Sequence, residues 1–545
     1  MKFLSFCLIS VLVGFSVKAQ AGKEPIRLFD NLGEYYYPIS TSSPLAQRYF
    51  DQGLILSYGF NHAEAARSFH QAYRLDPDCA ICYWGEALVL GPNINAPMDP
   101  SAALRAYKSA QKALELAPSK PDKEQSLIRA LFKRYAMEVY PDRTALDRAY
   151  ASAMRNVAAR FPDDAVIAAL CAESLMDLHP WDFWTRQGEP RPWTAEIVSI
   201  LEHALEIDIY NPLANHLYIH AMEASPYAEK AIASAERLPS LVPDSGHLAH
   251  MPSHIYIRVG RYRDAIAANR QAVGIDHDYL SDAHAESIYT FAYVPHNYHF
   301  LWAAAIKTGQ KALASKAAAD TASRVNRSMM REPGFSGTLQ HFYTIPLYTK
   351  AMFGEWDAIL SEPAPAADLI YVNGVWHYVC GLALLRQGRD DESLRELESL
   401  QALIADPAAA KLTIFDINSV AQLLQIGAAI LHGELAAKNK DYAAAIAHLQ
   451  KAVKLEGELN YIEPKDWYLP SRQVLGAVLL EAGKAGEAGQ VYRQDLIDHP
   501  QNGWSLFGLA QSLRRQGKTK EADDVERQFK HVWADADVTL TSSRF

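Results

Sequence analysis

The chain has 545 residues, of which 49% are hydrophobic and 21% charged, and its formal net charge is −10. This hydrophobic content is enough for a large core or several domains. No basic stretch marks a nucleic-acid-binding surface, and low-complexity segments and long charge runs are absent. We therefore expect an ordered chain that binds no nucleic acid.

The first 21 residues have the three parts of a secretory signal peptide. Lys2 supplies the positive start, Phe3–Val17 the apolar run, and Ala19–Ala21 the small residues for cleavage. The alternative is a single anchor helix, although the run is short for a membrane span. No second long apolar run follows. We expect an exported protein, periplasmic or secreted, with no membrane span in the mature chain and with residues 22–45 as a lead-in.

From residue 46 onward the chain repeats one helical pattern. It is clearest in the segments 60–78, 261–276, 440–457 and 484–500. A small residue stands where two helices would cross, a bulky residue follows four positions later in most, and Ala often follows three further on. The first segment has Ala65, Phe69 and Ala72 in these places, with Pro77 at its end. Small residues let two helices approach closely, and the bulky residue fills the groove between them.

This pattern resembles the tetratricopeptide repeat, a helix–turn–helix of 34 residues. Its spacing predicts about twelve repeats. They begin near Ala46, Ala80, Pro121, Ala165, Pro212, Gly246, Pro295, Gln340, Gly374, Ile426, Leu469 and Gly503. The resemblance implies an all-α fold, an α–α superhelix (solenoid) in which the first helix of each repeat lines a concave groove. No segment has a convincing strand pattern.

We divide the repeats into residues 46–339, which would carry the groove described below, and residues 340–536. A tail, 537–545, ends the chain, and we expect the residues from Ala534 to Phe545 to be loosely held. Insertions interrupt the repeats at residues 90–98, 179–192, 280–294 and 331–337. We expect the third insertion to be helical. Such loops either decorate the surface or close a groove.

Histidines concentrate in the central repeats. Nine of the chain's 19 histidines lie between Asn215 and His299. His216, His220 and Glu223 follow the spacing i, i+4, i+7, which places them on one face of a helix. The resemblance implies that the first helices of three successive repeats turn these side chains into the groove.

Neutral imidazole is a common metal ligand, and a pair at i, i+4 can chelate one ion from one helix. We predict that the metal ligands are His216, His220, His250, His254 and His299. Further ligand-binding residues would be His247, His296, Asp177 and Tyr256. A site of histidines and carboxylates suits zinc, copper or iron. The Glu of an H-E-x-x-H motif is missing beside His216, so a zinc protease is disfavoured.

Three functions stay open. The first is an exported binding protein whose groove takes a peptide, protein or small molecule through a histidine-rich pocket, with or without a metal. The second is a metal-dependent enzyme, a hydrolase or oxidoreductase, in which Glu223 or Glu173 acts as the base. The third is a protein-interaction scaffold without a cofactor.

The phrases NPLANHLYIHAMEAS (211–225) and GHLAHMPSHIYIRVGRY (246–262) also resemble an exported bacterial subgroup of tetratricopeptide-repeat proteins with histidine-rich central repeats. Earlier phrases of the same subgroup are C-x-x-C-Y-W-G-E-A-L at 79–88 and GPNIN at 91–95. The resemblance covers residues 46–310 and implies no particular reaction.

The cysteines allow two interpretations. Cys79 and Cys82 would form a local disulfide or remain two thiols, and the alternative is a redox or metal role at a helix start. Cys171 and Cys380 fall at core positions of their repeats, where a cysteine packs as a small apolar residue.

Overall fold

The computed structural model describes residues 26–138, 142–282 and 288–545. The predicted signal peptide and the centre of the 280–294 insertion lie outside these residues. The described chain forms two compact units. The smaller unit comprises residues 26–182 with Ile200–Leu213, and the larger comprises Phe183–Ser199 with Ala214–Phe545.

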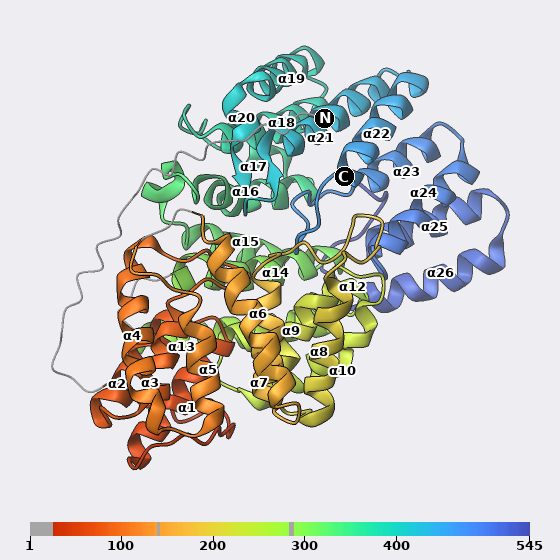
Figure 1. Cartoon of the computed structure of the whole chain (residues 1–545). Helices are drawn as coiled ribbons and strands as arrows, with labels where there is room; N and C mark the ends of the chain where they lie inside the picture. Colours follow the sequence, from red (N-terminus) through yellow and green to blue (C-terminus); the bar gives the residue numbers. More distant parts are fainter. Residues whose placement is uncertain (1–25, 139–141, 283–287) are drawn as a thin grey trace. The chain divides into compact units, whose positions relative to one another are not determined.

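The smaller unit consists of helices that pack on their neighbours in the chain. These helices are α1 (Pro44–Tyr58), α2 (His62–Leu75), α3 (Ala80–Val89), α4 (Ala103–Leu116), α5 (Asp122–Phe132), α6 (Thr144–Arg160), α7 (Ala165–Met176) and the part of α8 (Thr194–Ile207) from Ile200 on (Figure 1). Short 3₁₀ turns at Pro100–Ala102 and Ala117–Ser119 flank α4.

Packing in this unit follows the repeat pattern. Phe69 on α2 is fully buried and stands edge-on to Phe50, with ring centroids 5.4 Å apart. Gly53 on α1 and Gly85 on α3 face the same ring: a Cβ at either glycine would lie 2.9 or 2.4 Å from it. Glycine is therefore required at both positions, because any side chain would push the two helices away from Phe69.

A disulfide joins Cys79 and Cys82 at the start of α3. The structure thus selects the local disulfide among the interpretations of this cysteine pair. Cys171 and Cys380 are buried thiols, as predicted.

The larger unit continues the helical series. Its first helices are α9 (Pro212–Glu223, in this unit from Ala214), α10 (Ile232–Leu241), α11 (Gly246–His250), α12 (Pro252–Arg258), α13 (Tyr262–Asp282), α14 (Val294–Lys307), α15 (Lys311–Ser323), α16 (Ser336–Met352) and α17 (Trp356–Leu360). The others are α18 (Ile370–Arg386), α19 (Asp390–Ala405), α20 (Pro407–Lys411), α21 (Val420–Lys438), α22 (Tyr442–Gly457), α23 (Ser471–Glu481), α24 (Ala485–Asp498), α25 (Gly503–Arg515) and α26 (Thr519–Val532). Short turns lie at Ala228–Ala231, Arg327–Arg331 and Trp533–Asp535, and a π-helical turn at Tyr289–Tyr293 precedes α14.

The all-α prediction is confirmed. Each of the twelve predicted starts lies within six residues of the start of a helix that opens a pair. These opening helices are α1, α3, α5, α7, α9, α11, α14, α16, α18, α21, α23 and α25. The same use of glycine recurs in the larger unit, where the buried Tyr492 lies against Gly476 and Gly508.

One small departure lies between α20 and α21. Two-residue strands, β1 (Thr413–Ile414) and β2 (Asn418–Ser419), pair antiparallel. The turn between them places Phe415 and Asp416 at positive φ. So short a hairpin has no alternating pattern that a sequence could display.

The C-terminal tail is held by specific contacts. Asp537 accepts hydrogen bonds from the backbone amides of Lys311 and Ala312 and so caps the start of α15. Arg386 donates to the backbone oxygen of Phe545. The tail therefore packs on the larger unit, and the prediction that it is loosely held is wrong.

By length and composition, α21 is the one helix of the described residues that could cross a membrane. Of its apolar stretch, 78% is buried inside the structure, as in the core helix of a folded domain.

Candidate metal centre

Four helices of the larger unit carry the clustered histidines: α9, α11, α12 and α14. On α9, His216, His220 and Glu223 share one face, as their spacing predicts. The first helix of the next pair is divided, because Pro252 has no amide hydrogen to donate and so begins a new helix, α12. His250 closes α11 and His254 lies on α12.

Two histidine triads are arranged so that each could hold one metal ion. We call them the first triad (His216, His220 and His247) and the second triad (His250, His254 and His296). Within each triad, one nitrogen from every ring lies within 4.8 Å of the other two. They are the two such groups among the residues that the structure describes.

The triads adjoin each other. The ring centroids of His220 and His254 are 5.5 Å apart, and those of His247 and His250 are 5.9 Å apart. Five of the six rings are at most 2% exposed, and His296 is partly exposed. The predicted ligands are therefore enclosed, whereas the sequence analysis expected them to line a groove.

Glu223 joins the two triads. One carboxylate oxygen, Oε1, lies 3.0 Å from Nδ1 of His220, and the other, Oε2, contacts Nδ1 of His254. Burial alone would raise the pKa of Glu223. The neighbouring His254 and His220 outweigh burial and lower that pKa to about 2. A carboxylate on the far nitrogen of a histidine is the usual outer partner of a metal ligand, because it fixes the orientation of the ring.

Asn269 on α13 has the same role for His250. Its amide nitrogen donates to the backbone oxygen of Ala265 at 2.7 Å, so its oxygen is the atom that faces Nδ1 of His250, also at 2.7 Å. Nδ1 of His250 must therefore carry the hydrogen. Nδ1 of His254 must carry one as well, because its partner, the ionised Glu223, only accepts.

The remaining nitrogens of His250 and His254 face each other. Their Nε2 atoms are 2.9 Å apart. When both rings are neutral and carry their hydrogen on Nδ1, each Nε2 has a lone pair, and the two lone pairs repel each other. A shared cation, either a proton or a metal ion, relieves this repulsion.

The surroundings favour neutral imidazoles. Burial, followed by the neighbouring histidines, lowers the pKa of His247, His250 and His296 well below its ordinary value. Burial also lowers the pKa of His220. Neutral imidazole is the form that binds metals, so these four histidines would need to lose no proton.

Phe300 on α14 shields the second triad. Its ring centroid is 4.4 Å from that of His254, 4.6 Å from His250 and 4.8 Å from His296. A three-histidine site with an apolar wall leaves one coordination position for water or another ligand.

His299, predicted as a metal ligand, lies outside both triads. Its ring faces His341 and Tyr468, at centroid distances of 5.8 and 5.3 Å, and makes no hydrogen bond with the described residues. His296 and His299 are three positions apart on α14 and contact different neighbours.

The other predicted residues lie elsewhere. Tyr256 is on α12, with the guanidinium of Arg261 4.4 Å from its ring centroid. Glu173 and Asp177 belong to the smaller unit, where Arg134 donates to Asp177 at 2.7 Å. Burial and the neighbouring Asp177 raise the pKa of Glu173 to about 8.

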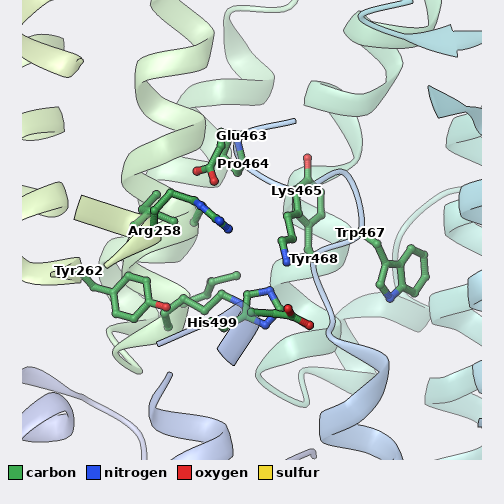
Figure 2. Close-up of a pocket in the computed structure, with 13 residues that line it drawn as sticks. Arg258, Tyr262, Glu463, Pro464, Lys465, Trp467, Tyr468 and His499 are labelled. Carbon is green, nitrogen blue, oxygen red and sulfur yellow. The ribbon is translucent and has the colours of Figure 1, made fainter. Parts of the chain in front are cut away.

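Sequence reasoning missed Asn269, Phe300 and a pocket in the same unit. Arg258, at the end of α12, reaches into this pocket together with Lys465, and His499 lies on its lower side in Figure 2. The segment between α22 and α23 contributes Glu463, Pro464, Lys465, Trp467 and Tyr468 to the lining. Arg258 lies within the phrase 246–262 and Asn269 within the repeat segment 261–276, but nothing in these patterns indicates a place in a pocket or beside a histidine.

Residues 427–458, which span most of α21 and α22, match the family described as "Tetratricopeptide repeat". This segment is a tetratricopeptide repeat. The predicted resemblance is thereby confirmed for one helix pair of the larger unit, and the other tetratricopeptide-like pairs follow the same order of elements. The exported bacterial subgroup stays a prediction.

No curated protein matches the chain in sequence. Solved structures with similar helix order include the human IFIT1 dimer with m7Gppp-AAAA, at 13% identity, covering 91% of this chain and 92% of that one, with a TM-score of 0.32. Another is the APC/C hetero-tetramer Cut9–Hcn1, at 13% identity, 90% and 88% coverage and a TM-score of 0.29. A third is the P58(IPK) TPR domain, at 12% identity, 87% and 99% coverage and a TM-score of 0.21.

Proposed function

We propose that the chain is a tetratricopeptide-type scaffold that holds a transition-metal centre in its larger unit. The first and second triads would supply the ligands, and Glu223 would orient one histidine of each. Zinc, copper and iron all suit such a ligand set.

The pair of facing Nε2 atoms on His250 and His254 carries the proposal. Nδ1 of His250 faces Asn269, and Nδ1 of His254 faces Glu223. The Nε2 atoms of the two rings point toward each other and are 2.9 Å apart. Burying five imidazoles and one ionised carboxylate has a high cost in free energy unless a cation compensates it.

Elemental mass spectrometry of the untagged chain tests the proposal. We expect one or two equivalents of one transition metal, lost in the double variant His220→Ala, His250→Ala. The matched control is His432→Ala, His448→Ala, which removes two stacked histidines, 4.9 Å apart, from α21 and α22. The control should keep its metal.

Two results would overturn the proposal. One is a parent chain that takes up no metal even after reconstitution with zinc, copper and iron. The other is a folded double variant that keeps the full complement. Circular dichroism of each variant, compared with the metal-free parent, separates loss of ligands from loss of fold.

A metal-dependent enzyme remains the second candidate, and one observation favours it. Arg258 lies one helical turn after His254 on α12 and lines the pocket of Figure 2. A substrate in that pocket would lie close to the second triad. Turnover by the metal-loaded chain that is absent from the metal-free chain would decide for an enzyme.

We also propose that the chain acts outside the reducing cytosol. The signal-like first 21 residues and the Cys79–Cys82 disulfide support export, because disulfides persist in oxidising compartments. Cell fractionation with an antibody against the chain tests this, and a purely cytosolic signal would contradict it.

A further inference from the structure

The pocket of Figure 2 contains more hydrogen-bond donors than the protein satisfies. Lys307 on α14 and Lys465, between α22 and α23, both line it. Neither ammonium group makes an ion pair or hydrogen bond with any residue in the described part of the chain. Burial lowers the pKa of Lys307 to about 8.

Two further donors are unused. The Nε group of Arg258 is buried without a hydrogen-bond partner among the described residues. Tyr262, only 2% exposed, brings its hydroxyl to the same wall, and no described residue accepts from it. A buried donor without an acceptor costs about 1 to 3 kcal/mol, and this cost applies in full to the Arg258 Nε. The two lysines and Tyr262 line the pocket beside it without an acceptor among the described residues.

The pocket's own carboxylates do not supply the missing acceptors. Asp498 accepts from Nη1 of Arg472 at 2.7 Å. Glu463 accepts from the Tyr461 hydroxyl at 2.8 Å through Oε1, its Oε2 is buried and accepts from none of the described residues, and burial raises its pKa. His499 is not a fourth cation beside Lys307, Lys465 and Arg258, because burial lowers its pKa to about 3. The pocket therefore has an excess of positive charge.

The remaining walls are apolar. Ile257, Ala303, Ile306, Pro464 and the rings of Trp467 and Tyr468 complete the lining. The hydroxyl of Tyr468 contacts Nε2 of His341. A ligand that fits both features has oxygen atoms with negative charge at one end and a compact apolar body.

We propose that this pocket binds a small organic oxyanion, held by Lys307, Lys465, Arg258 and the Tyr262 hydroxyl. A carboxylate and a phosphate ester share this chemistry. The charged oxygens would accept from the two ammonium groups and the guanidinium, as charge-assisted hydrogen bonds. The pocket requires no metal, so this inference is independent of the proposed metal centre.

Isothermal titration calorimetry with benzoate and with inorganic phosphate tests the proposal. The full chain is used after removal of metal by a chelator, so a failure of the metal proposal leaves the result interpretable. We expect saturable binding of at least one probe at one equivalent. Lys465→Ala and Lys307→Met should each weaken that binding about ten- to hundredfold, the effect of losing a hydrogen bond to a charged group.

The matched control is Lys454→Ala, which removes an exposed lysine of α22 that does not line the pocket. It should bind the probes as the parent does, which excludes a general effect of net charge. Neither pocket lysine has a hydrogen bond or an ion pair with the described residues, so its replacement breaks no such bond of the fold.

The two probes distinguish the source of the oxyanion. Binding of benzoate alone supports an organic carboxylate, binding of phosphate alone supports a phosphate-bearing ligand, and binding of both supports recognition of the charged group itself. The proposal is overturned if neither probe binds, or if Lys465→Ala and Lys307→Met bind as tightly as the parent.

Discussion

Replacing Glu223 by Gln is the sharpest test of the metal centre, because this side chain touches both triads and exposes none of its surface. A carboxylate accepts a hydrogen from Nδ1 of His220 through one oxygen and from Nδ1 of His254 through the other. A glutamine has the same shape but one acceptor oxygen and one donor nitrogen. It can hold only one of the two rings in the orientation that leaves Nε2 free for a metal.

The ring that faces the amide nitrogen must shift its hydrogen to Nε2 and is then lost as a ligand. We therefore expect Glu223→Gln to weaken one triad strongly and to leave the other nearly intact. Loss of an outer hydrogen-bond partner lowers metal affinity about 10- to 100-fold, or about 1.4 to 2.7 kcal/mol. The affected triad would also lose one of its ligands, so its affinity for metal should fall by at least this factor.

Cobalt titration followed by visible absorption measures both sites, with a competing chelator to set the free metal concentration. The matched control is Asp495→Asn, because Asp495 is another buried carboxylate that accepts from a histidine, His499, at 3.0 Å. That variant should lower the stability of the fold without changing metal binding. If Glu223→Gln binds two equivalents with the affinity of the parent, the assignment of Glu223 as the shared orienting group is refuted.

Three further predictions concern single sites. Asn269→Ala should weaken the second triad alone, about 10- to 100-fold, because His250 loses the partner that fixes its hydrogen on Nδ1; equal weakening of both triads in the cobalt titration would contradict this. Lys307→Met should raise the free energy of unfolding at pH 7 by on the order of 3 kcal/mol, because the folded state holds the pKa at about 8 instead of 10.5. The folded parent chain loses stability as the pH falls from 10.5 through 8, because its buried amine then becomes charged. The gain from Lys307→Met should therefore vanish near pH 10.5, and urea unfolding at pH 7 and at pH 10.5 measures the difference. Cys79→Ser, Cys82→Ser should destabilise the smaller unit by about 2 kcal/mol, the loop-closure value for four residues, and hydrogen exchange of α2 and α3 should reveal it, whereas unchanged exchange would refute it.

The helix pairs were predictable because the signal is local and repeated. A small residue followed by a bulky one marks each crossing, and the structure places Phe69 between Gly53 and Gly85 as that rule requires. The spacing of His216, His220 and Glu223 likewise predicts a shared face, which the structure confirms.

The detailed composition of the site was not predictable. His299 shares α14 with His296, but it turns toward Tyr468, a residue of the irregular segment between α22 and α23. Nothing in the repeat pattern reports where that segment lies. The same holds for Asn269, whose role depends on the rotamer that lets it donate to Ala265 and accept from His250.

The sequence also did not indicate that the histidines predicted to line a groove would be buried, for a related reason. Register positions report which side of a helix a residue occupies, but not how deeply the next helix covers it. At the second triad, Phe300 and the division of the helix at Pro252 bring the helices close enough to bury the rings. That closeness depends on three helix pairs at once, and no single repeat encodes it.

The histidines of the two triads come from three consecutive helix pairs, opened by α9, α11 and α14. In a stack of repeats each pair is stabilised by its immediate neighbours, and the array can fray wherever one interface is weak. With ions in both triads, two adjacent interfaces are cross-linked, and residues 216–296 would melt as one cooperative block. During synthesis the first triad becomes complete once His247 has emerged, and the second only after His296, so the block would close in order from its N-terminal side.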